Sequence, residues 1–320
     1  MTHPVRPGIG HADTWRQVDG ILLLDKPAGI TSSAAVQRVR RLLRARKAGH
    51  TGTLDPMATG LLPICLGEAT KFSHLLLGAD KTYVATIRLG VTTSTGDLEG
   101  DITARHDVRV SGRDLEQALR AFTGEILQTP PMYSALKRDG RPLYELARAG
   151  REVPRAPRPI VIHKLELLGR MADDLTVFVI CSKGTYVRAL AEDLGRSLGC
   201  GACLSGLRRE GVGNLRLGAG SLTLERLEQM TPTERDALLL PEDALVASLP
   251  RLDLDPGSAW RLCRGQPVTH GAGHPAGLAR VYGPGGSFIG VAEIMDCGKI
   301  VPRRLLSRAG AAVGDWPSIV

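Results

Sequence analysis

The sequence lacks several features that would assign it to a familiar class of protein. Its 320 residues include only six cysteines, irregularly placed, which is unlike the disulfide framework of a secreted domain. The single C-x-x-C pair, Cys200 and Cys203, has no further ligands at comparable spacing, so we expect packing rather than a metal site. The longest aliphatic runs, such as residues 21–24, are far too short to cross a bilayer. We therefore expect a soluble, cytoplasmic protein without a metal.

Nucleotide-binding signatures are also missing. The chain has no G-x-x-x-x-G-K-[ST] sequence, and Gly271 and Gly273 have neither a convincing strand before them nor a helix after them. His270 and His274 are four residues apart, but the surrounding glycines and Pro275 favour a loop over a helical metal site. These observations argue against a nucleotide-dependent enzyme.

Positive charge, by contrast, is abundant and clustered. Lys and Arg number 41 against 33 Asp and Glu, and the net charge of +8 suits a polyanionic partner such as nucleic acid. A generally basic surface would explain the total equally well, but it would not explain the clustering. The two clusters are Arg38, Arg40, Arg41, Arg44, Arg46 and Lys47, and Lys137, Arg138, Arg141, Arg148, Arg151, Arg155 and Arg158.

The pattern of apolar and turn residues predicts an α+β fold with a mixed or antiparallel central sheet. Strands are expected at 21–24, 83–89 and 175–181, without the regular βα alternation of a doubly wound sheet. After Pro250, frequent Gly and Pro and short apolar runs predict a small β-rich domain. We divide the chain into a flexible extension (1–17), a larger domain (18–250), the β-rich domain (251–312) and a tail (313–320).

Helix starts are marked by residues that can cap a helix. Thr31 precedes a helical stripe that contains Val36 and Val39, and Ser111 and Thr231 each have an acidic residue three positions later. A further helix is expected to follow residues 182–184 and to end before Gly199.

Residues 49–60, GHTGTLDPMATG, form the segment most suggestive of chemistry. Pro56 biases Asp55 away from helical backbone angles, and Gly52 and Gly60 allow the backbone to approach a ligand closely. An Asp followed by Pro is also a normal helix N-cap with proline at the first helical position. Taken alone, these residues favour the cap over a catalytic carboxylate.

The same segment, continued by LLPICLGEATK, resembles the signature of TruB-type tRNA pseudouridine synthases. The resemblance runs from about residue 20 to residue 306 and includes LDKPAG (24–29), KTY (81–83), PMYSALK (131–137), SKGTYVR (182–188) and LRR (207–209). Towards the C-terminus, the β-rich part is similar to the small PUA-type RNA-binding domain of this family in GQPV (265–268), GVAE (290–293) and VPRR (301–304).

The resemblance implies a pseudouridine synthase that acts on the T-loop uridine at tRNA position 55. It makes Asp55 the catalytic carboxylate, Arg188 its partner and Tyr83 a contact to the target uracil. The residues that it implies in shaping the pocket are His50, Tyr186 and Leu207. The isomerisation breaks a C–N bond and forms a C–C bond at the same sugar carbon without a redox change, so no cofactor is expected. Asp55 can either attack the substrate covalently or remove a sugar proton, and the sequence does not select between these routes.

Each of these residues also has a purely structural interpretation. By itself, Arg188 is a solvated charge on a helix, and Tyr83 and Leu207 are core residues. Tyr186, like Tyr83, is either core or a ring that stacks on an extruded base and whose hydroxyl can move a proton at C5. His50 is either a loop or capping histidine, or a ring that fills the gap left by the uridine.

Lys26 is predicted to contact RNA phosphates, together with Arg38, Arg41 and Arg44. Arg208 and Arg209 are further candidates for such contacts. The segment TTSTGD (92–97) departs from the family pattern, which often has acidic residues in a Thr-Asp-Thr-like stretch, so we assign it no role.

A rival function from a different class is a non-catalytic RNA-binding or RNA-folding protein on the same scaffold. Asp55 together with Tyr83 and Arg188 favours chemistry, because binding alone needs no acid at that position. We expect a monomer with tRNA as its partner and no obligate protein partner, since the sequence has no heptad or interface stripe.

Overall fold

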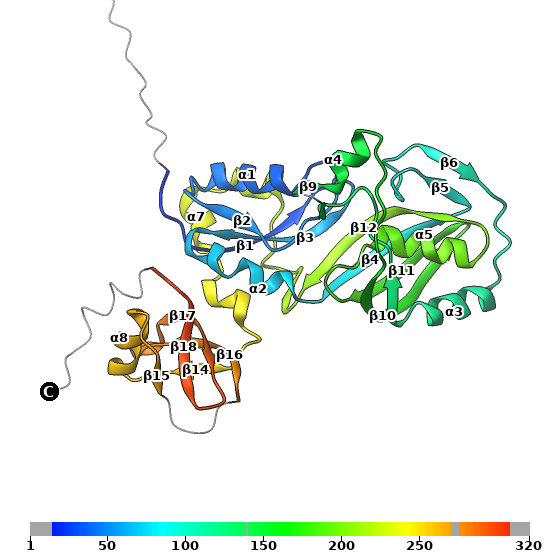
Figure 1. Cartoon of the computed structure of the whole chain (residues 1–320). Coiled ribbons are helices and arrows are strands. Elements are labelled where there is room, and N and C mark those ends of the chain that lie inside the picture. Colours follow the sequence, from blue (N-terminus) through cyan, green and yellow to red (C-terminus); the bar gives the residue numbers. More distant parts are fainter. Residues whose placement is uncertain (1–14, 139, 270–274, 308–320) are drawn as a thin grey trace, which may run out of the picture.

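The computed structural model describes residues 15–138, 140–269 and 275–307 (Figure 1). Most of the predicted N-terminal extension, the whole of the predicted tail, and His270 and His274 lie outside these residues. The end of the extension is held in place, since the Arg16 guanidinium forms a 2.5 Å ion pair with Asp236 and its backbone N–H donates to the carbonyl of Arg44.

The larger part of the described chain is built on one mixed sheet of nine strands. The pairings are antiparallel except for the parallel contact of β3 with β12, which confirms the predicted α+β class with a mixed central sheet. In spatial order the strands are β1 (Gly20–Lys26), β3 (Thr59–Leu66), β12 (Ala202–Val212), β4 (Lys81–Leu89), β11 (Asp174–Cys181), β10 (Arg158–Met171) and β7 (Gly124–Gln128), with β2 (Ala48–His50) beside β3 and β13 (Leu215–Arg216) beside β12.

Both faces of this sheet are covered at its β1 end. Alternate residues of β1 enter different cores: Leu22 and Leu24 belong to one, and Ile21 and Leu23 to the other. The first core is covered by α1 (Ser32–Leu42), α3 (Gly112–Ala121), α5 (Val187–Ser197) and α6 (Leu224–Gln229). The second contains η1 (Gly67–Lys71) and α2 (Ser73–Leu77), and a short helix, α7 (Pro232–Ala237), follows α6 in the chain.

The helix caps predicted at Thr31, Ser111 and Thr231 are present. The Thr31 hydroxyl accepts from the N–H of Ala34 at the start of α1. Ser111 and Thr231 form complete capping boxes with their acidic partners at the starts of α3 and α7. Local polar side chains therefore set these helix starts, as the sequence indicated.

A smaller sheet is formed by the C-terminal residues, in the region predicted to be β-rich. Its strands are β14 (Arg251–Asp253), β16 (Gly277–Tyr282), β17 (Phe288–Ile294), β18 (Lys299–Leu305) and β15 (Val268–Thr269), and the same region contains α8 (Pro256–Cys263) and η3 (Pro284–Gly286). The sheet packs against the second core and against η2 (Glu242–Val246): the ring of Phe288 lies 5.5 Å from that of Phe72, and the Tyr282 hydroxyl donates to Asp243 at 2.6 Å. The two sheets thus share one apolar layer.

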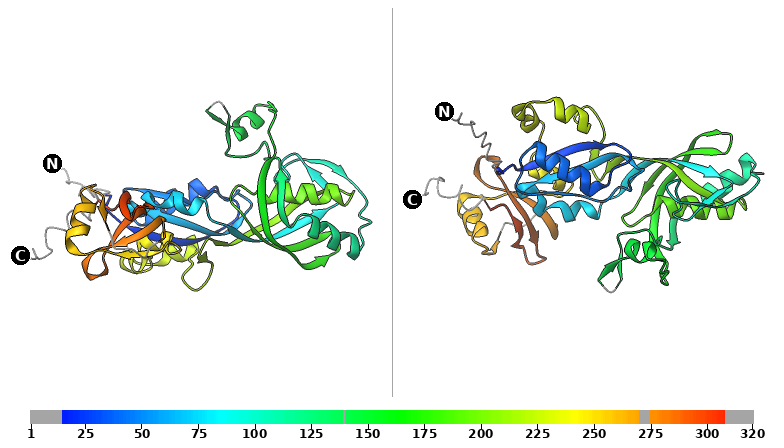
Figure 2. Two further views of the ribbon diagram at one scale, coloured as in Figure 1. Left: turned by 60° about the horizontal axis from the view of Figure 1, so that its bottom comes forward. Right: turned by 90° about the horizontal axis from the view of Figure 1, so that it is seen from above.

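One segment projects away from the large sheet (Figure 2). It contains the hairpin of β8 (Lys137–Arg138) and β9 (Arg141–Pro142) and the helix α4 (Leu143–Arg148), and it carries most of the second basic cluster. A second hairpin, β5 (Val91–Thr93) with β6 (Ile102–Arg105), lies next to β12. Among the described residues, no helix is long and apolar enough to cross a membrane.

Candidate active site

Asp55 lies in the irregular loop between β2 and β3. The loop is fixed at Leu54, whose N–H donates to the Ser32 hydroxyl at 2.8 Å and whose carbonyl accepts from the same hydroxyl at 2.9 Å. No helix starts at Pro56, so the interpretation of Asp55 as a helix cap is wrong. Its side chain remains 36% exposed, which leaves the carboxylate accessible to a ligand.

Arg188 holds the Asp55 carboxylate from the first turn of α5. Its side chain is only 5% exposed, so the interpretation as a solvated surface charge is wrong. The Nε donates to Asp55 at 2.9 Å, while the two Nη groups donate to the carbonyls of Thr95 at 2.9 Å and Tyr133 at 2.7 Å. Arg188 therefore links the loop that contains Asp55 to two other segments of the chain.

Asp97 is part of the same group, although no role was predicted for it. Its carboxylate is buried and lies 3.5 Å from the Nε of Arg188, and it accepts from the Thr95 hydroxyl at 2.5 Å. Arg188 is thus placed between two carboxylates, Asp55 and Asp97. Its role is evident only from its contact with Arg188, which is far away in the chain, so the local sequence did not single it out.

Two tyrosines lie within electrostatic reach of Asp55. Tyr83 is buried on β4, and burial raises the pKa of its phenol, an effect that the charge of Arg209 opposes. Tyr186 immediately precedes α5, and burial raises the pKa of its phenol as well. Both hydroxyls are therefore protonated, neutral groups at physiological pH.

Lys26 is not available to contact RNA phosphates, so this prediction is wrong. The side chain is 0% exposed, and its Nζ donates to the carbonyls of Pro27 and Ile30 at 2.8 Å and of Pro56 at 3.2 Å. Burial lowers the pKa of the Lys26 ammonium to about 8, although the charge of Asp55 opposes the shift. The residue acts on the site indirectly, by holding the carbonyl that follows Asp55.

His50 and Leu207 lie on the strands that flank the loop. His50 ends β2, and its Nδ1 accepts from the N–H of Gly52 at 3.2 Å. Burial, and then the charge of Arg209, lower the pKa of the imidazole, so the ring is neutral at physiological pH. Leu207 is half-buried on β12 against the first core.

Three family models together match most of the chain. The model described as "TruB family pseudouridylate synthase (N terminal domain)" matches residues 40–187, "tRNA pseudouridylate synthase B C-terminal domain" matches 188–247, and "Pseudouridine synthase II TruB, C-terminal" matches 250–306. A curated protein of Aromatoleum aromaticum named tRNA pseudouridine synthase B is 57% identical over 297 residues, which cover 93% of this chain and 96% of the relative. Its namesake in Pseudomonas aeruginosa is 52% identical and covers 91% of this chain and 97% of the relative. The chain belongs to the TruB family.

Solved structures agree with this membership. A structure titled as a Cbf5-Nop10-Gar1 complex matches with a TM-score of 0.67 and 27% identity, over 86% of this chain and 78% of the other. An H/ACA ribonucleoprotein bound to a substrate RNA containing 2′-deoxyuridine matches with a TM-score of 0.68 and 25% identity, over 89% and 84% of the two chains. The TruB fold is therefore shared with proteins that differ widely in sequence.

The arginines expected at an RNA surface of this TruB family member have several different environments. Arg38 pairs with Glu228 at 2.6 Å, and Arg208 forms a two-pronged ion pair with Asp25 at 2.7 and 3.0 Å. Arg209 is buried, so its predicted role as a phosphate contact is wrong. The side chains of Arg41 and Arg44 are exposed and form no ion pair or hydrogen bond among the described residues, so both remain candidates for that role.

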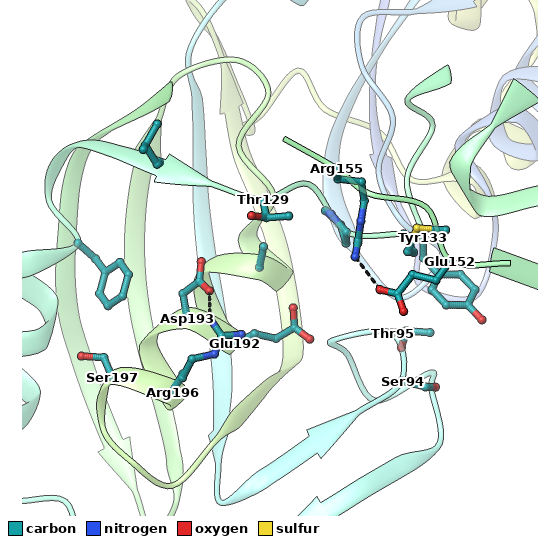
Figure 3. A pocket seen from close by; sticks show the side chains of 15 residues that line it. Ser94, Thr95, Thr129, Tyr133, Glu152, Arg155, Glu192, Asp193, Arg196 and Ser197 are labelled. Atoms are coloured by element: carbon teal, nitrogen blue, oxygen red, sulfur yellow. Dashed lines mark hydrogen bonds and ion pairs between the residues drawn. The ribbon is translucent and has the colours of Figure 1, made fainter. Parts of the chain in front are cut away.

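A cavity of about 820 Å³ adjoins the Arg188 side of the site (Figure 3). Thr95 and Tyr133, whose carbonyls accept from Arg188, form part of its wall. Two ion pairs line it, Arg155 with Glu152 at 3.0 Å and Arg196 with Asp193 at 2.7 Å (Figure 3). Because these charges are of both signs and already paired, the cavity is unlike the positive surface that an RNA backbone requires. Among the described residues, no group of three or more His, Cys, Asp or Glu side chains is placed to hold a metal ion.

Proposed function

We propose that this chain converts the uridine at position 55 of tRNA, in the T-loop, to pseudouridine. The observation that carries the proposal is a carboxylate, Asp55, that is open to a ligand and held at 2.9 Å by the buried guanidinium of Arg188. Membership of the TruB family supports it, because curated relatives that align over nearly their whole length are named tRNA pseudouridine synthase B.

The reaction conserves every atom of the substrate. The C1′–N1 bond breaks, the base turns within the site, and a C1′–C5 bond forms; the proton on C5 leaves and N1 gains one. No electrons are lost or gained, so the residues of the site suffice without a redox cofactor. The uridine must first leave the RNA stack, which costs a few kcal/mol of unstacking energy.

Asp55 acts either by attack at C1′ or by removal of a sugar proton. Both routes need an ionised carboxylate that points at the sugar. The hydrogen bond from Arg188 orients the Asp55 carboxylate and places a compensating positive charge beside it. Since Arg188 also donates to two backbone carbonyls, its own orientation is fixed before the RNA arrives.

The aromatic residues are assigned to the base. Tyr83 is neutral, so we assign it stacking and hydrogen bonding with the uracil rather than the removal of the C5 proton. We assign Tyr186, which immediately precedes α5, to the wall of the base pocket, and Leu207, half-buried against the first core, to an apolar part of that wall. The neutral ring of His50 is suited to fill the space that the extruded uridine leaves in the RNA.

The deciding experiment compares the parent protein with Asp55→Asn on an unmodified tRNA transcript. Pseudouridine is detected by chemical labelling and primer extension, and tRNA affinity is measured in parallel. We expect product at position 55 from the parent and none from the variant, with tRNA binding within about tenfold, or about 1.4 kcal/mol. Asp253→Asn, an exposed change in β14, is the matched control.

Two results would overturn the proposal. Product formed at the parent rate by Asp55→Asn would remove the carboxylate from the chemistry. A parent protein that binds the transcript but leaves every uridine unchanged would favour the rival function, a non-catalytic RNA-binding or RNA-folding protein.

We further propose that the protein acts in the cytoplasm as a monomer, without a protein subunit. Sedimentation velocity with and without tRNA tests the oligomeric state. A sedimentation coefficient for the free protein that corresponds to twice its mass of 34.2 kDa would contradict the monomer.

A further inference from the structure

Arg209 is the largest of the fully buried side chains in the described part of the molecule, yet the proposed chemistry makes no use of it. It lies on β12, where its register partners are Tyr83 on β4 and Gly60 on β3. The approach to β3 is very close: a Cβ on Gly60 would lie 2.4 Å from the carbonyl oxygen of Arg209. Arg209 is therefore enclosed between the strand that carries Tyr83 and the strand that follows the Asp55 loop.

The guanidinium of Arg209 binds the backbone on both sides of Asp55. Its Nη2 donates to the carbonyl of Gly52 at 3.1 Å and its Nη1 to that of Thr53 at 3.4 Å, ahead of Asp55 in the chain. Its Nε donates to the carbonyl of Leu61 at 2.8 Å, on β3 beyond the loop. One rigid planar group thus clamps the two ends of the loop, and the Gly52 residue that it holds also donates its N–H to His50.

The positive charge of Arg209 has carbonyl acceptors but, within the described residues, no carboxylate at ion-pair distance. Burying a charge without an opposite charge costs several kcal/mol, so folding alone would favour an apolar side chain here. The charge is felt in the site, since it lowers the pKa of the His50 imidazole in the same direction as burial does.

We propose that Arg209 is a positioning residue for the isomerisation: it fixes the backbone that carries Asp55 and places an uncompensated positive charge beside the residues assigned to the base. The proposal rests on the proposed function. It gives Arg209 an effect on the rate of the chemical step and little effect on the affinity for tRNA, because the side chain cannot reach the RNA.

The kinetic test uses Arg209→Met and Arg209→Lys, with Arg88→Met as the matched control. Arg88 is an ion-paired arginine near the far end of β4. Under single turnover with saturating protein, we expect the Met variant to be about 100-fold slower, because small displacements of a catalytic group have effects of this size. We expect its Kd for tRNA to stay within about threefold of the parent value, which corresponds to less than 1 kcal/mol. The Lys variant keeps the charge but not the planar guanidinium, so its rate should lie between those of the parent and the Met variant.

A second readout does not depend on activity. The pKa of His50 is measured by NMR in the parent and in both variants, with His50→Gln to assign the signal. We expect it to rise in Arg209→Met, where the charge is lost, and to stay at the parent value in Arg209→Lys. If the parent made no pseudouridine, the proposed function would fail while this electrostatic result could still be obtained.

Clear outcomes would overturn the inference. A folded Met variant with a rate within about threefold of the parent would show that the clamp does not matter to the chemistry. An unchanged His50 pKa in that variant would contradict the electrostatic component of the proposal. If the Met variant does not fold, the Lys variant decides: a parent rate in Arg209→Lys contradicts the positioning role, and a slower rate at unchanged Kd supports it.

Discussion

At the scale of single residues, the site is organised around Arg188, and we predict that Asp97 is needed to orient it. Asp97→Asn keeps the shape of the side chain but removes the charge that lies 3.5 Å from the Arg188 Nε. We expect the rate of pseudouridine formation to fall at least about tenfold, or about 1.4 kcal/mol in barrier. Asp101→Asn, an exposed change near the same hairpin, should have the parent rate. Equal rates for the two variants would show that Asp97 only caps its own loop.

Lys26 gives a prediction about pH. Its folded pKa of about 8 lies below the ordinary value of 10.5 because of burial. Between these two values the unfolded chain binds a proton that the folded chain does not, so this residue makes the free energy of unfolding rise with pH, by at most about 1.4 kcal/mol per pH unit. Below pH 8 both states carry the charge and the contribution is constant.

The measurement is urea unfolding of the parent and of Lys26→Met at pH 7, 8, 9 and 10. The free energy of unfolding of the parent, relative to that of Lys26→Met, should increase above pH 8. A constant difference over the whole range would mean that Lys26 keeps its ordinary pKa. A neutral Lys26 amine can donate to only two of the three carbonyls, and the contact to Pro56, at 3.2 Å, is the longest. We therefore expect this contact, which holds the backbone next to Asp55, to be lost above pH 8 and the activity to decline.

At the scale of elements, the start of α5 depends on one buried side chain from another strand. Gln128 ends β7 and is 2% exposed; its amide accepts from the N–H of Tyr186 at 2.8 Å and donates to the carbonyl of Tyr186 at 3.1 Å. Tyr186 gives α5 no side-chain cap, and Gln128 instead fixes the backbone of this residue, which precedes the helix. Arg188 follows two residues later in the helix.

We therefore predict that Gln128→Ala lowers the free energy of unfolding by about 1–3 kcal/mol, the cost of leaving a buried polar group without a partner. The rate of pseudouridine formation should fall as well, because the helix that carries Arg188 loses its anchor. Chemical denaturation and single-turnover assays measure both effects. Gln117→Ala, at an exposed position of α3, is the control and should change neither; a stable Gln128→Ala protein with the parent rate would contradict the prediction.

The elements that sequence reasoning located correctly are those with local signals. The alternating β4, the helix that Thr31 caps and the capping boxes all depend on residues a few positions apart. The burial of Arg209 was missed because its acceptors are far away in the chain: Gly52 lies 157 residues from Arg209. Lys26 was missed although two of its acceptors, the carbonyls of Pro27 and Ile30, lie within four residues of it. Only the three-dimensional path of the chain brings distant groups together. One local signal was overlooked: α8 is capped by Asp255, which stands before a proline.

At the scale of the whole molecule, the distribution of charge predicts how tRNA binding responds to salt. Lys137, Arg141 and Arg151 are exposed on or beside the projecting segment and carry no ion pair within the described chain. If each neutralises one phosphate, replacing all three by Ser should reduce the slope of log Kd against log salt by about three. Filter binding between 50 and 200 mM salt measures the slope, with Arg113→Ser on α3 as the control. An unchanged slope in the triple variant would place the RNA elsewhere on the protein.

The two sheets are predicted to unfold together rather than as separate domains. The boundary near residue 250 was drawn from composition, but the apolar layer beneath η1 contains Phe72 and Cys65 from the large sheet's side together with Val281 and Ile289 from the small sheet. Lys71 strengthens the junction, since its Nζ donates to the carbonyl of Leu305 at 3.0 Å. The small sheet and one face of the large sheet therefore bury apolar side chains in the same core.

Phe72→Ala tests this coupling, because the ring belongs to the larger part and packs, tilted by 55°, against Phe288 of the smaller one. We expect a loss of about 3–5 kcal/mol for a fully buried phenylalanine. Calorimetry should show one transition for the parent and one, at lower temperature, for the variant. Trp260→Ala removes a larger ring from an exposed position of α8 and should change stability by no more than about 0.5 kcal/mol. Two separate transitions, with only one shifted by Phe72→Ala, would mean that the small sheet folds on its own and that its orientation toward bound RNA is not fixed by the shared core.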